Sequence, residues 1–579
     1  MPRDSGEADT LAGAMASVHL GGENDPIMRP GYGSVGRPLP VITNAYEVKA
    51  PTIIAYHYDI KIKPDNPPTP PRLNREIWNY LAQELKIFGD IAVCYDGRSM
   101  AYSPIKLPNE EGTWNIVLPE SDENPKNTRD FTVKIKFTRP VDLNRLGVFV
   151  RGEALGTDQV PDPSEVQSAI QALNILIQHG PSMVYPSRAA SFFLPPAQPA
   201  QASISRGLTM WRGFYTSLRL GPQKLFLNLD IASQPMVQAG NLPEVVLNFL
   251  RGDNRGLDMR QMTANNIPPQ QFIRLNRFLK GLKVQLACAD ADGYKPTRKI
   301  KSIEGWPANS QDPAHVFEAN GATHTIQSYF RHVYGVQLKF PDFPVIAVSK
   351  TARWPLECCV VESGQKWTKK LDPDQTAEAI RLTTVAPQQR VPMLTEGLKR
   401  VRPGSEALKQ WEVDIKPQPI EVTARELAPP LIGYKQQQVR PNNGVWQIRG
   451  QKLASAARIE RWLVLVFDSD RFFDVRDAQS AVMNLVAAAE DLGLHIGDKQ
   501  PPIHYVPRGG DVPTTIRELG SQLMQSHGGP PDLVVCFLPR KPCDQYGEIK
   551  RFGDVTMGVA TQCLFENKAK KGNREYWTN

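Results

Sequence analysis

Apolar runs alternate with amphipathic segments from about residue 456 to residue 579. The run WLVLVF at 462–467 predicts a buried strand, and AQSAVMNLVAAAEDLG at 478–493 has the spacing of a helix. The same alternation continues along the chain through IHYV, TTIRELGSQLMQ, LVVCFLP and VATQCL. Because neighbouring parallel strands need helical crossovers, we predict a mostly parallel, Rossmann-like α/β domain over 456–579.

The first part of the chain shows the period-2 alternation of half-buried strands instead. IIAYHYDIKIKP at 53–64 predicts a strand, 74–85 has helical spacing, and IAVCYD and FTVKIKF add short strands. We therefore predict an α+β domain over residues 29–155. Residues 156–234 predict a linker domain, with a helix in SEVQSAIQALNILIQH and strands in LTMWRGFYTSLRL and KLFLNLDIA.

Between these parts, residues 235–375 open with helical segments and continue in short apolar runs, VQLACA, VQLKF and VIAVS. This pattern predicts a small β-barrel with a helical insert. Residues 376–455 combine one short helix with proline-rich extended chain, which is typical of a second linker. Residues 1–28 are rich in Gly, Ala, Ser and Asp without periodicity, and we predict a disordered leader there.

Composition narrows the class of protein. A chain of 579 residues suggests roughly four domains, and its 51 prolines indicate many loops and connections. The net charge of +8 permits an anionic partner without identifying one. Seven cysteines without a CxxC pair argue against a disulfide framework or a structural zinc site, and neither a signal peptide nor a long apolar run occurs. We expect an intracellular protein that does not enter a membrane.

The segment CDQYGEIKRFGD carries the strongest local chemistry. If a helix follows Asp544 as its N-cap, Tyr546 and Lys550 are four residues apart on one face. The helix comes after the buried strand LVVCFLP, at the sheet edge where open α/β domains bind ligands, and Gln562 follows one strand later. A ring for stacking, a cation and an amide donor suit a terminal nucleotide, whereas a solvated helix face is the alternative for such a pair elsewhere.

The segment LPRKPCDQYGEIKRFGDVTMGVATQC closely resembles the MID domain of eukaryotic Argonaute proteins. GVWQIRGQK, PPLIGY, WPLECCVVESGQKWTKKLDPDQT, YHYDIKIKP and FGDIAVCYDGR extend the resemblance over nearly the whole chain from about residue 29. It implies the order N domain, linker 1, PAZ, linker 2 and MID. Family members continue beyond YWTN into a PIWI domain of ribonuclease H type, so the resemblance also implies that the chain ends before that nuclease domain and before the lysines that complete the 5′-phosphate site.

The resemblance assigns roles to particular residues. Tyr546 is similar to the residue that stacks on the first base of the guide RNA, and Lys550 and Gln562 are similar to ligands of its 5′ phosphate. The loop from Arg540 through Lys541 to Gln545 is similar to the loop that reads the first base, and it is one residue longer than the usual animal pattern.

In the PAZ region, Tyr329 and Tyr334 are similar to the tyrosines that contact the 3′ end of the guide, with simple packing at a barrel rim as the alternative. Arg298 and Arg353 stand where the family pattern has tyrosine, which implies a more highly charged pocket or two solvated arginines. Two basic groups are predicted to line the same face or to be merely solvated: Lys295, Arg298, Lys299 and Lys301, and Lys366, Lys369 and Lys370.

Two functions follow from these observations. The first is guide small-RNA binding in RNA silencing, without slicer activity in this chain; the second is a scaffold or competitor protein with weak RNA binding. HExxH, GxSxG and P-loop motifs are absent from the sequence, so we expect no catalytic residues, no metal and no cofactor. The expected partners are a single-stranded guide RNA, a complementary target RNA and silencing-complex proteins, in the cytoplasm and also the nucleus.

Overall fold

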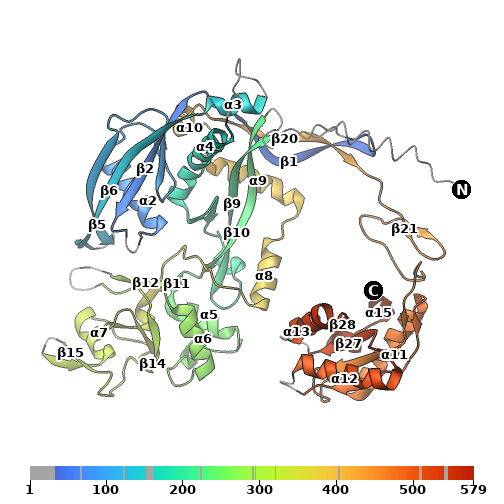
Figure 1. Ribbon diagram of the computed structural model, residues 1–579. Coiled ribbons are helices and arrows are strands. Elements are labelled where there is room, and N and C mark those ends of the chain that lie inside the picture. Colours follow the sequence, from blue (N-terminus) through green and yellow to red (C-terminus); the bar gives the residue numbers. More distant parts are fainter. Residues whose placement is uncertain are drawn as a thin grey trace. The chain divides into compact units, whose positions relative to one another are not determined.

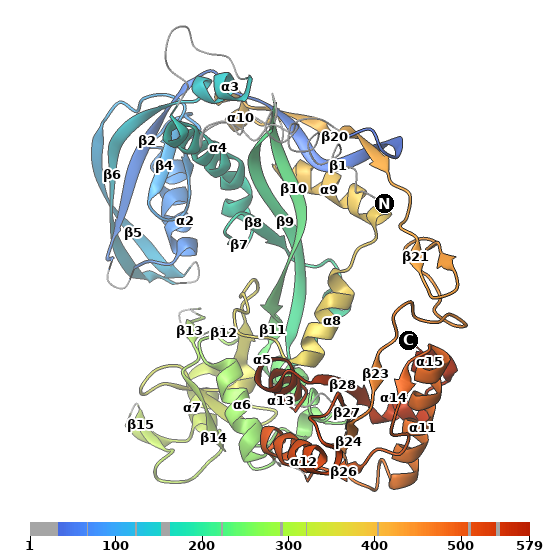
Figure 2. The ribbon, with the colours of Figure 1, turned by 45° about the vertical axis from the view of Figure 1, so that its right-hand side comes forward.

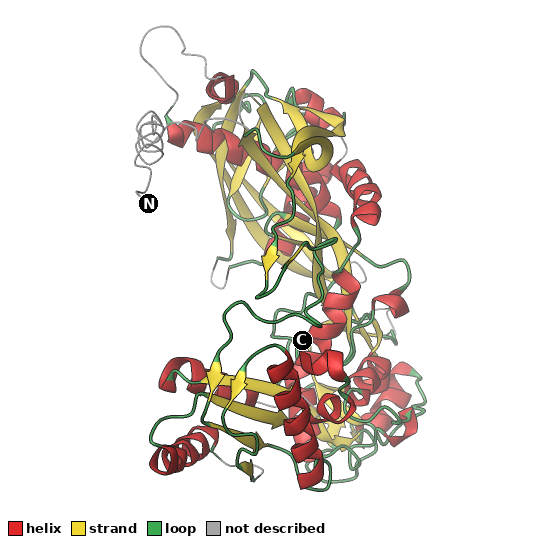
Figure 3. Cartoon of the chain, turned by 90° about the vertical axis from the view of Figure 1, so that its right-hand side faces the viewer, coloured by secondary structure: helices red, strands yellow, loops and turns green. Residues whose placement is uncertain are grey.

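The computed structural model describes residues 33–65, 68–121, 124–151, 162–221, 224–289, 293, 295–319, 321–401, 404–507, 511–539 and 545–578. The predicted leader at 1–28 lies outside these residues. The chain divides into an N-terminal unit, mainly Leu39–Ala424, and a C-terminal unit of Arg425–Asn579 together with Val35–Pro38. Figure 1 follows the chain through both units, and Figure 3 shows the same chain with strands in yellow and helices in red.

The α+β domain at the start of the N-terminal unit contains an antiparallel sheet with strand order β3-β4-β2-β6-β5. Its strands are β2 (Ile54–Lys63), β3 (Cys94–Tyr95), β4 (Met100–Ser103), β5 (Glu111–Ser121) and β6 (Asn124–Asp142). Helix α2 (Pro71–Asn79) starts three residues before the predicted position, because proline is well suited to the first turn of a helix, and it continues as a π-helical turn at Tyr80–Glu84. Trp78 of α2 stacks on Tyr95 of β3, with the ring centroids 4.5 Å apart.

A second sheet, with order β20-β1-β10-β9-β8-β7, joins distant parts of the sequence. Figure 2 shows its long β9–β10 hairpin. The strands are β1 (Arg37–Lys49), β7 (Ser187–Arg188), β8 (Ser191–Leu194), β9 (Leu208–Gly221), β10 (Lys224–Val237) and β20 (Asp414–Glu426). The associated helices are α3 (Asn144–Arg151), α4 (Pro163–Val184), α8 (Pro373–Thr383), α9 (Pro387–Val401) and α10 (Glu406–Gln410).

The predicted barrel region consists of small sheets around one apolar core, with orders β11-β19-β12-β13 and β14-β17-β18. These strands are β11 (Gly240–Asn241), β12 (Lys283–Leu286), β13 (Thr297–Lys299), β14 (Ser302–Pro307), β17 (Pro344–Ala347), β18 (Arg353–Pro355) and β19 (Cys359–Val361). Helices α5 (Leu242–Arg251) and α6 (Pro269–Leu279) lie between β11 and β12, and the insert contains β15 (Phe317–Ala319), β16 (Ala322–His324) and α7 (Ile326–Tyr334).

One predicted strand in this region is wrong. VQLKF at 336–340 forms no strand, although its residues alternate in character. The backbone N–H groups of Lys339 and Phe340 each donate to the Glu357 carboxylate at 3.0 Å. A side chain therefore satisfies the donors that a neighbouring strand would otherwise pair with.

The C-terminal unit confirms the predicted parallel α/β sheet, with order β26-β24-β27-β28. Its strands are β24 (Trp462–Val466), β26 (Ile503–Tyr505), β27 (Leu533–Leu538) and β28 (Ala560–Phe565). The helices are α11 (Val475–Asp491), α12 (Val512–His527), α13 (Gln545–Arg551), α14 (Glu566–Lys571) and α15 (Arg574–Thr578). Smaller pairings join β21 (Ile432–Gly433) to β22 (Gln438–Val439) and β23 (Arg458–Ile459) to β25 (His495–Ile496).

Strand β24 is buried on both faces. Trp462 and Val464 pack into the core that contains α11, whereas Leu463 and Leu465 pack into the core that contains α12. A central strand of this kind has no polar face, which explains its continuous apolar sequence.

Candidate nucleic-acid interface

The helix that follows β27 carries the first two predicted site residues. Tyr546 and Lys550 both belong to α13, so the predicted four-residue spacing within one helix is confirmed. Tyr546 is 52% exposed, which leaves its ring available for stacking on a base. Lys550 is partly buried, and its ammonium group points to the neighbouring strand β28.

Strand β28 positions Lys550 and also carries Gln562. The Lys550 Nζ donates to the main-chain oxygen of Thr561 at 2.6 Å and to Thr561 Oγ1 at 3.1 Å. Thr561 is buried, whereas Gln562, the next residue of the strand, is exposed. The structure therefore brings the Lys550 ammonium to the residue beside Gln562, with the amide side chain open to solvent.

Two thiols lie directly behind this site. Cys536 of β27 is paired in register with Cys563 of β28. A hydrogen bond with the Cys536 thiol lowers the pKa of Cys563, and the charge of Lys550 acts in the same direction, against the opposing effect of burial. The positive charge of Lys550 therefore acts on the Cys563 thiol of β28 as well.

Arg540 and Lys541, the predicted residues of the base-reading loop, lie outside the described residues, as does Asp544, the predicted N-cap. Their contribution to the 5′-end site stays a prediction.

The predicted 3′-end residues Tyr329 and Tyr334 lie on α7, which begins at a capping box formed by Thr325 and Ser328. Their ring centroids are 6.3 Å apart. Tyr329 also meets Phe317 edge-on at 5.2 Å and His324 at 6.0 Å. The two tyrosines therefore belong to one aromatic cluster, and both are partly exposed.

The two arginines predicted to add charge to this pocket belong to different sheets. Arg353 is in β18, a strand that α7 contacts, and its Nε lies 3.4 Å from the Glu304 carboxylate of β14. Its Nη1 is also within 3.4 Å of the main-chain oxygens of Ser349 and Lys350. Arg298 is in β13, opposite Val284. The charge of Arg353 is therefore partly neutralised within the protein.

Sequence reasoning missed two residues that set the electrostatics of these sites, Thr561 and Glu304. Thr561 holds the Lys550 ammonium, and Glu304 is the counter-charge of Arg353. Both contacts depend on which strands lie side by side, and the spacing of residues along the chain does not show this.

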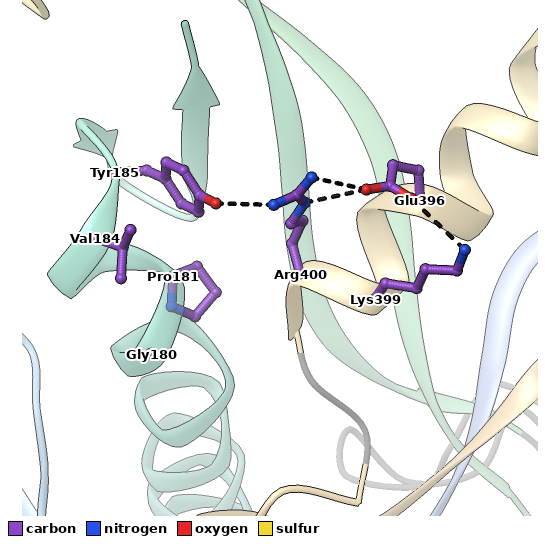
Figure 4. A pocket seen from close by; sticks show the side chains of 7 residues that line it. All are labelled: Gly180, Pro181, Val184, Tyr185, Glu396, Lys399 and Arg400. Atoms are coloured by element: carbon purple, nitrogen blue, oxygen red, sulfur yellow. Dashed lines mark hydrogen bonds and ion pairs between the residues drawn. The ribbon is translucent and has the colours of Figure 1, made fainter.

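A cavity of about 390 Å³ lies between α2, α4 and α10, with a smaller one of about 180 Å³ beside it. Figure 4 shows the smaller cavity, where Arg400 lies between Tyr185 and Glu396. Arg400 donates to the Tyr185 hydroxyl at 3.1 Å and to Glu396 at 2.8 and 3.2 Å. Each nitrogen of the Arg400 guanidinium thus already donates a hydrogen bond within the protein. These hydrogen bonds connect the C-terminal end of α4 to α9.

In the described ranges, no group of three or more His, Cys, Asp or Glu side chains is arranged to hold a metal ion. Among the helices of those ranges, none has the length and apolar character needed to cross a bilayer.

Comparison with known families gives matches in the same order as the modules of the structure. Residues 37–177 match the N-terminal domain of argonaute, 187–238 the Argonaute linker 1 domain, 257–380 the PAZ domain and 440–522 the Mid domain of argonaute. The chain belongs to the Argonaute family. None of these four matches is to a PIWI domain.

Individual Argonaute relatives agree with this assignment. The "Protein argonaute" of Schizosaccharomyces pombe is 29% identical over 565 residues, which are 95% of this chain and 64% of that protein. A crystal structure of Kluyveromyces polysporus Argonaute with a guide RNA superposes with a TM-score of 0.62 at 16% identity, covering 95% of this chain and 65% of that one. The chain thus spans slightly less than two thirds of the length of these relatives, and the second comparison supports the shared fold.

Proposed function

We propose that this chain binds a single-stranded small guide RNA, with the 5′ phosphate at Lys550 and Gln562 and the first base stacked on Tyr546. The observation that carries the proposal is that α13 and the adjoining strand β28 supply the three groups: the Lys550 ammonium held by Thr561, the exposed Gln562 that follows Thr561, and the exposed Tyr546 one helical turn before Lys550. An ammonium and an amide donor suit a terminal phosphate, and an exposed ring suits a base. The K. polysporus relative was solved with a guide RNA, which supports the same class of ligand.

The 3′ end of the guide is proposed to bind the aromatic cluster at α7, through Tyr329 and Tyr334. Arg298 and Arg353 are proposed to add phosphate contacts there. For Arg353, such a contact has to compete with the ion pair to Glu304. Arg540 and Lys541 are proposed to contact the first nucleotide.

A filter-binding experiment with two RNAs of one sequence tests the function. The RNA with a 5′ phosphate should bind more tightly than the same RNA with a 5′ hydroxyl, and Lys550→Gln should reduce the difference. Equal binding of both RNAs by the unaltered chain would contradict a 5′-phosphate site and favour the scaffold or competitor function.

We further propose that this chain by itself does not cleave RNA and requires no cofactor. Purified chain incubated with a guide, a labelled complementary target and Mg²⁺ or Mn²⁺ should leave the target intact. A single guide-dependent product, cut at a fixed distance from the 5′ end of the guide, would refute this part of the proposal. Cytoplasmic and nuclear location, and association with silencing-complex proteins, are proposed on the family relationship.

A further inference from the structure

Strands β27 and β28 place two cysteines side by side. Cys536 and Cys563 are direct partners in the parallel pairing of these strands. Neighbouring strands lie about 4.8 Å apart, and residues in register on parallel strands direct their side chains to the same face of the sheet. Both thiols pack into the apolar core to which α12 and α13 contribute. This spacing lies within the range of about 4.4 to 6.8 Å between Cα atoms that a disulfide bond requires.

The two thiols differ in their access to solvent. Cys536 is fully buried, whereas Cys563 is partly exposed. A hydrogen bond from the Cys536 S–H to the Cys563 sulfur, together with burial, raises the pKa of Cys536 well above its usual range. A dissolved oxidant can therefore reach Cys563, while Cys536 remains a protonated thiol shielded behind it.

A cation on the same face of β28 favours the thiolate form of Cys563. Thr561 and Cys563 are two residues apart on this strand, so their side chains share one face. The Lys550 ammonium donates to Thr561 Oγ1 at 3.1 Å. The hydrogen bond from Cys536 lowers the pKa of Cys563 and the charge of Lys550 lowers it further, against burial and the charge of Asp554. An accessible thiol beside a cation and a hydrogen-bond donor is typical of a reactive cysteine.

We propose that Cys563 is an oxidation site for hydrogen peroxide, with Cys536 as the thiol that converts the oxidised form into a disulfide. The proposal goes beyond RNA binding and does not depend on it. In the first step the Cys563 thiolate attacks the peroxide. The S–O bond forms as the O–O bond breaks, and the departing hydroxide takes a proton from solvent and leaves as water.

In the second step the Cys536 sulfur attacks the sulfenic acid sulfur of Cys563. The S–S bond forms as the S–O bond breaks, and the proton of Cys536 joins the departing hydroxide as a second water. In total, two thiols are oxidised to one disulfide, and one hydrogen peroxide is reduced to two waters. The Cys536 S–H is already directed at the reacting sulfur by its hydrogen bond.

Peptide mapping of the purified full chain without RNA tests the proposal. After exposure to hydrogen peroxide, the remaining thiols are alkylated, and the peptides are analysed by mass spectrometry without reduction. A peptide pair joined through Cys536 and Cys563 should appear, and dithiothreitol should abolish it. Cys94 is the internal reference, because it is buried in the N-terminal unit and burial raises its pKa. It should remain a free thiol.

Two cysteine variants separate the steps. Cys536→Ala should stop the reaction at the sulfenic acid of Cys563, which dimedone labels. Cys563→Ser should leave the buried Cys536 reduced. Far-UV circular dichroism identifies a variant that fails to fold, and in that case the map of the unaltered chain decides.

Lys550→Gln tests the electrostatic part of the proposal. An opposite charge close to an ionisable group shifts its pKa by about one unit or more. For each unit by which the pKa of Cys563 rises, the thiolate fraction falls about tenfold while its nucleophilicity rises about threefold, so disulfide formation should be roughly threefold slower. The matched control is Lys568→Gln, which removes the same charge from an exposed position of α14 and should leave the rate unchanged.

Several results would overturn the proposal. Cys563 could remain as reduced as Cys94, or it could form its disulfide with Cys543, which lies outside the described residues. Persistent sulfenic or sulfinic acid at Cys563 of the unaltered chain, with Cys536 reduced, would refute the role of Cys536. Equal rates for Lys550→Gln and Lys568→Gln would refute activation by the lysine. None of these results bears on the 5′-end site, which filter binding in a reducing buffer tests separately.

Discussion

Replacing Thr561 by valine tests how the strand next to α13 orients the proposed phosphate ligand. Thr561 supplies two acceptors to the Lys550 ammonium, its main-chain oxygen at 2.6 Å and its hydroxyl at 3.1 Å. Valine has a similar shape and suits a strand, but it removes the hydroxyl and leaves the main-chain acceptor. The ammonium group of Lys550 should then occupy a wider range of positions before RNA binds.

The magnitude follows from the single hydrogen bond that is lost. A net contribution of about 0.5 to 1.5 kcal/mol is expected for one such bond, which corresponds to roughly two- to thirteenfold weaker binding of 5′-phosphorylated RNA. A hydrogen bond from a charged donor contributes more, about 1.5 to 3 kcal/mol, but the retained main-chain acceptor reduces the loss. Binding of 5′-hydroxyl RNA should change little, because that RNA brings no terminal phosphate to Lys550.

Thr561→Ser is the matched variant, because it keeps the hydroxyl and loses the methyl group. Thr561 is 8% exposed, and a Cβ added at Gly553 would lie 2.5 Å from its Cγ2, so the methyl group is closely packed. Its removal should cost about 0.8 kcal/mol of folding free energy with little effect on RNA affinity. Thr561→Val should show the opposite behaviour, with weaker 5′-phosphate binding at nearly unchanged stability.

These predictions are measured by filter binding of both variants to both RNAs and by urea unfolding of both variants. If Thr561→Val binds 5′-phosphorylated RNA as tightly as the unaltered chain, the lysine is not oriented by this hydroxyl. Equal weakening of both RNAs would show instead that the substitution disturbs the domain as a whole.

Three further outcomes are expected. Tyr546→Ala should weaken RNA binding by roughly 5- to 150-fold, since base stacking is worth about 1 to 3 kcal/mol, while Tyr546→Phe should bind normally; a change below twofold in Tyr546→Ala would reject the stacking role. Glu304→Gln should release Arg353 and make RNA binding both tighter and more salt-dependent, and unchanged salt dependence would show that Arg353 makes no phosphate contact. Burial lowers the pKa of His179 from 6.5 to about 4. The free energy of unfolding should therefore be highest above pH 6.5 and should fall as the pH drops towards 4, by about 1.4 kcal/mol per pH unit. Urea unfolding across this range checks the third outcome, and His179→Gln, which can still accept the Tyr95 N–H, should lose that part of the pH dependence.

Local patterns in the sequence were sufficient for features that depend on neighbouring residues. The four-residue spacing of Tyr546 and Lys550 places them on one helix because α-helical geometry repeats every 3.6 residues. The apolar run of β24 and the amphipathic helices α11 and α12 were likewise enough to predict a mostly parallel sheet.

Contacts between distant segments were not predictable in this way. The acceptor for Lys550 depends on where β28 lies relative to α13, and the counter-charge of Arg353 depends on the pairing of β14, β17 and β18. Lys366 was grouped with the PAZ face from its position in the sequence, whereas the bridge to Met236 places it at the linker sheet. The run VQLKF has strand-like alternation, but the Glu357 carboxylate takes its backbone donors.

The order of strands β20-β1-β10 has a consequence for the synthesis of the protein. Strand β1 pairs on one side with β10, which ends at Val237, and on the other with β20, which begins at Asp414. At about 5 to 20 residues per second, the ribosome needs roughly 10 to 35 s to make the chain between these two strands. During that interval one edge of β1 stays open, and an open strand edge is a template for pairing with another chain. Fragments released before Asp414 should therefore aggregate, whereas chains that extend past Glu426 can close the edge themselves.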